Sequence, residues 1–204
     1  MDFFALYDRI VTLAAEPAHA ARVAEMRQVF EARTGAFGPL DPWFEVRSRA
    51  FWDDALTRQG FAREPALPPE ARPWVDAMDR AHRGLFRVDR RDSMQVLVDL
   101  WSGAEFVVTY ADASSRAALQ AAAGLFDARL VGLDDPVTLV LLPGALFHPE
   151  DATLAIETVL VAARASGIGE HDVFDALLRM ERNFRSLSRV KASYAYRPEA
   201  LRAH

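Results

Sequence analysis

The spacing of apolar residues changes twice along this chain, at Gly84 and again after Gly144. Before Gly84, apolar side chains recur every three or four residues, the period of a helix with one buried face. Between the two glycines, β-branched and aromatic residues form short runs separated by turn sequences, which predicts strands. After Gly144 the helical period returns. The chain is therefore predicted to have a helical part at 1–83, a β part at 84–143 and two C-terminal helices within 144–204.

The β part contains five short apolar runs with short connections between them. Ser102 and Gly103 suit a tight hairpin, and turns are predicted at 89–93 and 134–136. The small residues at 111–123 predict one or two helical turns, and the segment before Gly84 predicts a last short helix at 73–84. Short connections favour antiparallel pairing, so we expect a small antiparallel β-barrel or a curled sheet.

The fold class that follows is α+β. The N-terminal helices and the last helix each carry a long apolar stripe that needs cover. We therefore expect the two C-terminal helices to pack back on the N-terminal helices and to share a core with them. Prolines at positions 65, 68, 69 and 73 predict an irregular crossing between these helices.

Three segments of the β part resemble a known sequence pattern. They are "GLFRV" at 84–88, "VLVDLWSGAEFVV" at 96–108 and "GLFDARLVG" at 124–132. Together they are similar to a small β-barrel module of uncharacterised bacterial proteins, in which an L-x-D-x-x-[ST]-G-x-x-[YF]-x-V hairpin precedes a glycine and "ARL". The resemblance covers about 84–143 and implies a small barrel. It carries no catalytic residues to this chain.

Composition limits the chemistry that the chain can perform. It has 204 residues, a net charge of −5 and no cysteine, which excludes disulfides, thiol catalysis and cysteine-ligated metal sites. Glycine-rich phosphate loops, the nucleophile elbow and the H-E-x-x-H zinc motif are also missing. An acidic start and the lack of a long apolar run argue against a leader or a membrane span. We expect a soluble, unprocessed cytoplasmic protein without a cofactor.

Positive charge gathers near the C-terminus of this otherwise acidic chain. The residues from His171 to His204 carry a net +3, whereas the remaining 170 residues carry −8. We interpret Leu177–Arg197 as one helix with a basic ridge on its outer face, formed by Arg179, Arg182, Arg185, Arg189 and Lys191. Arginine favours bidentate pairing with carboxylates, so the first hypothesis is a non-enzymatic adaptor that presents this ridge to an acidic protein partner.

Two other interpretations of the ridge stay open. With Tyr194 and Tyr196 nearby, the ridge could follow a nucleic-acid backbone while the tyrosines stack on bases, although the acidic body of the protein opposes broad affinity for phosphate. Alternatively, the ridge is a solvated helix face. The apolar seam of the same helix, which includes Val173, Leu177 and Met180, packs either within the chain or against a second copy in a homodimer.

His148, Glu150 and Asp151 form the most site-like polar cluster in the sequence. An imidazole and two carboxylates at a helix start could hold a divalent ion or exchange a proton. However, proline and acidic residues also favour helix initiation by themselves. The same two interpretations apply to His171 at the start of the last helix, where Asp172 and Asp175 follow.

The third predicted helix places Glu45 and Asp53 beside large aromatic residues. Such surroundings raise a carboxylate pKa and could produce a general acid, which is the basis of an enzyme hypothesis with an unknown substrate. Arg47, Arg49 and Arg58 lie within helical reach and could instead form exposed ion pairs with these acids.

Overall fold

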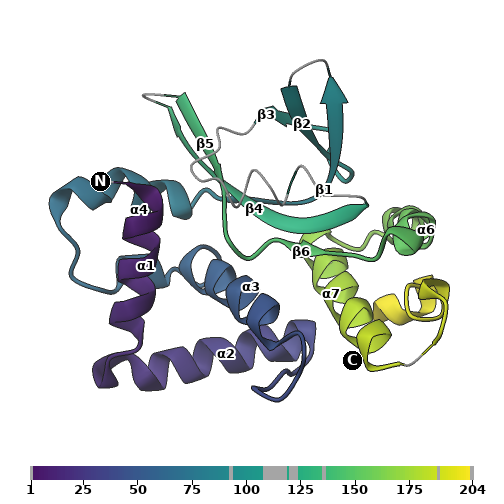
Figure 1. The fold of residues 1–204 in the computed structure, drawn as a ribbon, viewed down its shortest axis with the longest axis horizontal. Coiled ribbons are helices and arrows are strands. Elements are labelled where there is room, and N and C mark those ends of the chain that lie inside the picture. The colour runs from purple at the N-terminus through teal and green to yellow at the C-terminus, as the bar shows by residue number, and fades with distance from the viewer. Residues whose placement is uncertain are drawn as a thin grey trace.

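The structure is a computed structural model that describes residues 2–91, 94–107, 119, 124–134, 137–187 and 189–202. Within these residues it confirms the α+β class, with six α-helices and a six-stranded antiparallel sheet (Figure 1). The helices are α1 (Phe3–Ala14), α2 (Ala20–Thr34), α3 (Phe44–Leu56), α4 (Arg72–Met78), α6 (Thr153–Ala165) and α7 (Glu170–Ser186). The strands are β1 (His82–Arg91), β2 (Met94–Asp99), β3 (Glu105–Val107), β4 (Leu125–Asp134), β5 (Val137–Leu141) and β6 (Leu146–Phe147).

The sheet is open rather than closed into a barrel. Its strand order is β3-β2-β1-β4-β5, and β6 pairs with β4 beside this path. Of the two alternatives that the sequence left open, the structure therefore has the curled sheet. β4 is the central element, because its first half pairs with β1 and β6 and its second half pairs with β5.

The predicted boundary between helix and sheet is wrong by a few residues. The last N-terminal helix was expected to reach Gly84, but α4 ends at Met78 and β1 already begins at His82. The reason is pairing with β4, in which His82 lies opposite Leu130 and Arg83 lies opposite Arg129. Ladder hydrogen bonds to a neighbouring strand outweigh the helical preference of a short segment.

The turn predicted at 89–93 also starts later than expected. β1 continues to Arg91, because the residues from Asp89 onward pair with β2. The rest of that turn, at 92–93, lies outside the described residues. So do most of the predicted turn at 134–136 and the helical segment predicted at 111–123, except for the buried Leu119.

Of the three apolar clusters among the described residues, two lie against one face of β4. The third includes Phe126 and Leu130, which alternate along the strand with the β4 residues of the other two. Val131, near one end of β4, packs into a cluster built mainly from α1, α2, α3 and α4. Leu125, at the other end, packs with Leu85 into a cluster built from α6, α7 and the residues that follow α7. Figure 1 shows the N-terminal helices below one end of the sheet and α6 with α7 at the other.

Charged residues occupy the middle of that same face. Leu125, Asp127, Arg129 and Val131 occupy every second position of β4, with the charged pair between the apolar residues. All four side chains therefore point to the same face, toward the helices. Asp127 and Arg129 are each only 4% exposed. The two helical parts of the chain therefore meet at a buried polar centre that lies between their apolar clusters.

Contacts between α7 and the N-terminal helices are also polar. Arg47 of α3 is 1% exposed and donates hydrogen bonds to the backbone oxygens of Thr34, at 3.2 Å, and of Leu178. It also pairs with Glu181 of α7 at 3.3 Å. α7 thus packs back against α2 and, through Arg47, contacts α3. The sequence predicted such packing for both C-terminal helices, but α6 packs with α7 and with residues 198–202 in the C-terminal cluster. Within the described residues, no helix combines the length and the apolar character needed to cross a bilayer.

Candidate functional site

The last helix is shorter than the sequence suggested. α7 ends at Ser186, and Leu187 has extended backbone, so Arg189 and Lys191 follow the helix instead of continuing its face. The chain turns back there and buries Ala192 and Tyr196 in the C-terminal apolar cluster. These two side chains can be buried only if the helix stops before them, and the apolar area that they bury favours an end of α7 at Ser186.

Three of the five predicted ridge residues are bound within the chain. Arg179 donates to the backbone oxygen of Arg33, and Arg182 donates to that of Ala36. Arg33 lies in the last turn of α2, where a helix leaves its carbonyls without partners, and Ala36 lies two residues after the helix. Arg185 bonds to Glu181 one turn earlier on α7. Arg179 and Arg182 therefore connect α7 to the end of α2 and the loop after it, and a continuous exposed ridge along α7 does not form.

Beyond the helix, cationic and apolar side chains share an exposed surface. We call Leu187, Arg189, Lys191, Tyr194 and Arg197 the C-terminal basic surface. Leu187 is 48% exposed and Tyr194 is 67% exposed. The three cationic residues are also exposed, and among the described residues none of them forms an ion pair. Leu187, Tyr194 and Arg197 line a hollow of about 390 Å³, whose other lining residues include Asn183, Ser186 and the acidic Glu199.

The structure separates the three members of the His148 cluster. His148 is 4% exposed and its Nδ1 lies 2.9 Å from the hydroxyl oxygen of Tyr196, whereas Glu150 and Asp151 face solvent. Burial lowers the pKa of His148 to about 4, so its imidazole is neutral at pH 7. Among the described residues, no three acidic or histidine side chains are placed to hold a metal ion.

Glu45 and Asp53 lie on α3 but in opposite environments. Glu45 is exposed and pairs with Arg49 at 2.7 Å, the local ion pair that the sequence allowed. Asp53 is fully buried, and it accepts hydrogen bonds from the Tyr7 hydroxyl and the Gly144 amide, both at 2.8 Å. Burial raises the pKa of Asp53 to about 7, the direction expected from its sequence surroundings.

Both titratable groups are closed off from solvent. Asp53 is 0% exposed and His148 is 4% exposed, and neither lines the hollows beside Leu67, Tyr194, Arg83 or Asp172. A general acid must reach its substrate to within hydrogen-bond distance, directly or through one water. The perturbed pKa values of Asp53 and His148 therefore report burial in the folded chain.

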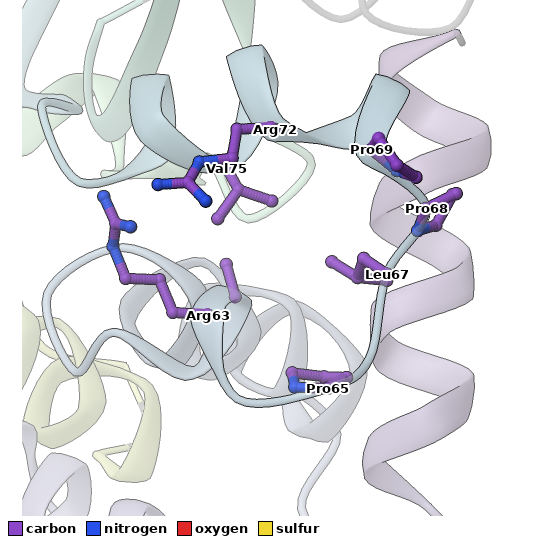
Figure 2. Close-up of a pocket in the computed structure, with 8 residues that line it drawn as sticks. Arg63, Pro65, Leu67, Pro68, Pro69, Arg72 and Val75 are labelled. Atoms are coloured by element: carbon purple, nitrogen blue, oxygen red, sulfur yellow. The ribbon is translucent and has the colours of Figure 1, made fainter.

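The proline-rich crossing encloses another hollow, of about 470 Å³ (Figure 2). Figure 2 shows Leu67, Pro68 and Pro69 at one end of it and the guanidinium groups of Arg63 and Arg72 at the other. Arg63 pairs with Asp76 and Asp79, and Arg72 also pairs with Asp76. Because local carboxylates compensate both charges, this hollow offers no net charge to a ligand.

The basic residues of the polar centre were not among the sequence-predicted sites. Arg83 and Arg129 are each 4% exposed, and both line a smaller cavity with Arg58 and His171. A signal was present for Arg129, which stands on a predicted strand two residues from Val131, whereas Arg83 fell in a predicted helix. Comparison of the chain with family models, with curated proteins and with solved structures finds no match.

Proposed function

We propose that the protein is a non-enzymatic cytoplasmic interaction protein that binds an acidic segment of a partner protein at the C-terminal basic surface. The observation that carries this proposal is that Leu187, Tyr194 and Arg197 line one hollow, on a segment that also carries the exposed Arg189 and Lys191. Exposed aromatic residues and arginine are both enriched in protein interfaces. Carboxylates of the partner would pair with the cations while an apolar side chain contacts Tyr194.

Charge distribution supports an acidic partner. The segment from His171 to His204 carries a net +3 on a chain whose remainder carries −8. An acidic partner is attracted to this end and repelled elsewhere, which orients the encounter. The hollow beside Tyr194 has about 390 Å³, which is enough space for one large side chain of the partner.

The structure indicates which substitutions test this surface without disturbing the fold. Arg189 and Lys191 form no ion pair or hydrogen bond through their side chains among the described residues, so R189E/K191E changes the surface charge alone. Arg9 and Arg80 are equally exposed, lie outside the C-terminal surface and have no such partners in that part of the chain. R9E/R80E is therefore a control with the same change in net charge.

The experiment immobilises wild type, R189E/K191E and R9E/R80E and exposes each to native lysate, with and without nuclease. A protein retained by wild type and by R9E/R80E after nuclease, and lost from R189E/K191E, is the expected result. The identified partner is then purified, and reversal of its acidic residues to lysine should restore binding to R189E/K191E. Equal recovery by all three proteins would show that this surface does not bind a partner.

Nucleic acid is the competing occupant, because Tyr194 could stack on a base beside the same cations. In that case the recovered material disappears with nuclease. Binding to a labelled oligonucleotide would also weaken steeply with salt, whereas a protein interface with an apolar centre weakens less.

A further inference from the structure

A cavity of about 240 Å³ lies where the N-terminal helices, the sheet and α7 meet. Four basic side chains from four different segments line it. Arg58 comes from the turn after α3, Arg83 from β1, Arg129 from β4 and His171 from the first turn of α7. Such convergence of cationic groups on one small cavity is a feature of anion-binding sites.

The acidic residues of the polar centre connect these arginines in a network. Asp175 of α7 accepts hydrogen bonds from Arg83 at 2.6 Å, from Arg33 at 3.0 Å and from Arg58 at 3.1 Å. Asp54 of α3 bonds to Arg33 and, at 2.6 Å, to Arg129. Asp127 pairs with Arg83 at 2.7 Å.

Positive charge exceeds negative charge in this network at neutral pH. The four guanidinium groups of Arg33, Arg58, Arg83 and Arg129 face the carboxylates of Asp54, Asp127 and Asp175. Asp53 is the next carboxylate that interacts with Arg129, and because burial raises its pKa to about 7 it is only partly ionised. An anion would supply the missing negative charge, whereas water would not.

Arg129 is the buried lining residue with the most donors that are not used within the described chain. Its side chain is 5% exposed, yet within the described residues only its Nη2 makes a hydrogen bond, to Asp54. Arg83, which lies opposite Arg129 on β1, donates hydrogen bonds through all three of its side-chain nitrogens. A guanidinium has five N–H donors. Nε and Nη1 of Arg129 are not among the enclosed atoms without a partner, so they are open to the cavity. Arg129 therefore presents unused donors to the cavity that it lines.

The other lining groups are compatible with a small anion. His171 lies in the first turn of α7, where the helix dipole favours negative charge. Asp79 also lines the cavity and would repel an anion, but it pairs with Arg63. A volume of about 240 Å³ is smaller than typical cofactor pockets, which excludes a nucleotide and suits a compact oxyanion.

We propose that this cavity binds a small anion with a phosphate or carboxylate group, held by Arg58, Arg129 and His171. Planar guanidinium groups bind both kinds of group through paired N–H donors. The site joins the two helical parts of the chain, so an occupied cavity stabilises their contact. This inference does not depend on the C-terminal basic surface.

The test measures binding of sodium phosphate and sodium malonate by calorimetry, with chloride adjusted to hold ionic strength constant. Wild type should bind at least one of the two saturably, and its unfolding temperature should rise with that anion and not with chloride. The two dissociation constants, for phosphate and for malonate, show whether the site prefers a phosphate or a carboxylate group. R58Q and H171Q remove donors from partly exposed positions and should each weaken binding at least fivefold. R9Q, an exposed position elsewhere, should leave binding unchanged.

A second measurement follows the His171 imidazole by NMR. Burial, with Arg58 and Arg83 nearby, holds the pKa of His171 below its usual value, while Asp175 acts in the opposite direction. A bound anion adds negative charge beside the ring, so saturating anion should raise this pKa in wild type and less in R58Q. The proposal is overturned if neither anion binds saturably. It is equally overturned if R58Q and H171Q bind as wild type does, because the anion then occupies another place.

Discussion

Arg83 and Arg129 lie directly opposite each other on neighbouring antiparallel strands, and both guanidinium groups are buried between the sheet and the helices. Burial lowers the pKa of Arg129, and repulsion between the two like charges lowers it further. The arrangement persists because Asp54, Asp127 and Asp175 bond to the two groups. This pair therefore makes the junction of the two helical parts depend on charge balance.

Asp175 should be the acidic residue on α7 whose loss costs most stability. Three guanidinium groups contact it, and D175N leaves them without their shared carboxylate. We expect the free energy of unfolding to fall by about 3–5 kcal/mol, the cost typical of breaking a buried ion pair. Denaturant unfolding measures this. D172N, at an exposed neighbouring position, should change it by less than about 0.5 kcal/mol.

Asp53 should make the protein less stable as pH rises from about 4 to about 7. Its pKa is 3.8 when unperturbed and about 7 in the folded chain, so the folded state binds more protons in this interval. This contribution to the free energy of unfolding is on the order of 4 kcal/mol. It is present in full below pH 3.8 and is completely lost above about pH 7.

D53N should remove this contribution, because an amide can accept from Gly144 and donate to Tyr7 without a charge. Denaturant unfolding at pH 4, 5, 6, 7 and 8 gives the difference between wild type and variant. Y7F should act in the opposite direction, since it removes a hydrogen bond that favours the ionised carboxylate. A wild-type profile parallel to that of D53N would contradict the assignment.

The histidines should titrate in an order set by their environments. The hydrogen bond to Asp99 raises the pKa of His82, whereas burial lowers that of His148 to about 4. Proton-coupled nitrogen spectra should therefore show His82 charging first as pH falls and His148 still neutral at pH 5. His148 contributes stability that is complete above about 6.5 and is lost as pH falls toward 4. Titration of His148 near 6.5 would show that its ring is exposed.

Gly144 should not tolerate a side chain. A methyl group there would lie 2.5 Å from Oδ2 of Asp53 and 2.6 Å from the backbone oxygen of Arg49. G144A should thus cost about 2–3 kcal/mol in the free energy of unfolding. G38A is the matched control, because a methyl group at Gly38 meets nothing within 4 Å. Thermal unfolding of the two variants should separate them clearly.

Arg179 and Arg182 should stabilise the fold, whereas Arg189 should not. R179A and R182A each remove a charged donor, from the backbone oxygen of Arg33 in the last turn of α2 and from that of Ala36 after it, at an expected cost of about 1–2 kcal/mol. R189A removes a side chain without partners in the described chain and should change stability by less than about 0.5 kcal/mol. Equal effects of the three substitutions on denaturant unfolding would contradict the helix-connecting role.

Local periodicity was sufficient to predict the α+β class, the order of the helices and of the first five strands, and the antiparallel pairing. These features depend on apolar spacing within about ten residues, which a sequence displays directly. Periodicity did not predict β6, which lies after Gly144, where a return to helix was expected. The aromatic surroundings drew attention to Glu45 and Asp53 alike, and only the structure shows that Asp53 is the buried one, with its pKa raised by that burial. Element ends were less accurate, because pairing and burial decide where α4 and α7 stop.

Only the tertiary structure decided which charged residues are buried and which are free. Arg33 and Asp175 are 142 residues apart in the chain, and Arg47 and Glu181 are 134 apart, yet each pair is in direct contact. Nothing in the local pattern distinguishes an arginine that will meet such a partner from one that will face water. The sequence by itself determined the elements and their order, while the packing of two helical parts against one sheet determined the polar centre. Its cause is physical, because the energy of a charge depends on its burial and on distant partners.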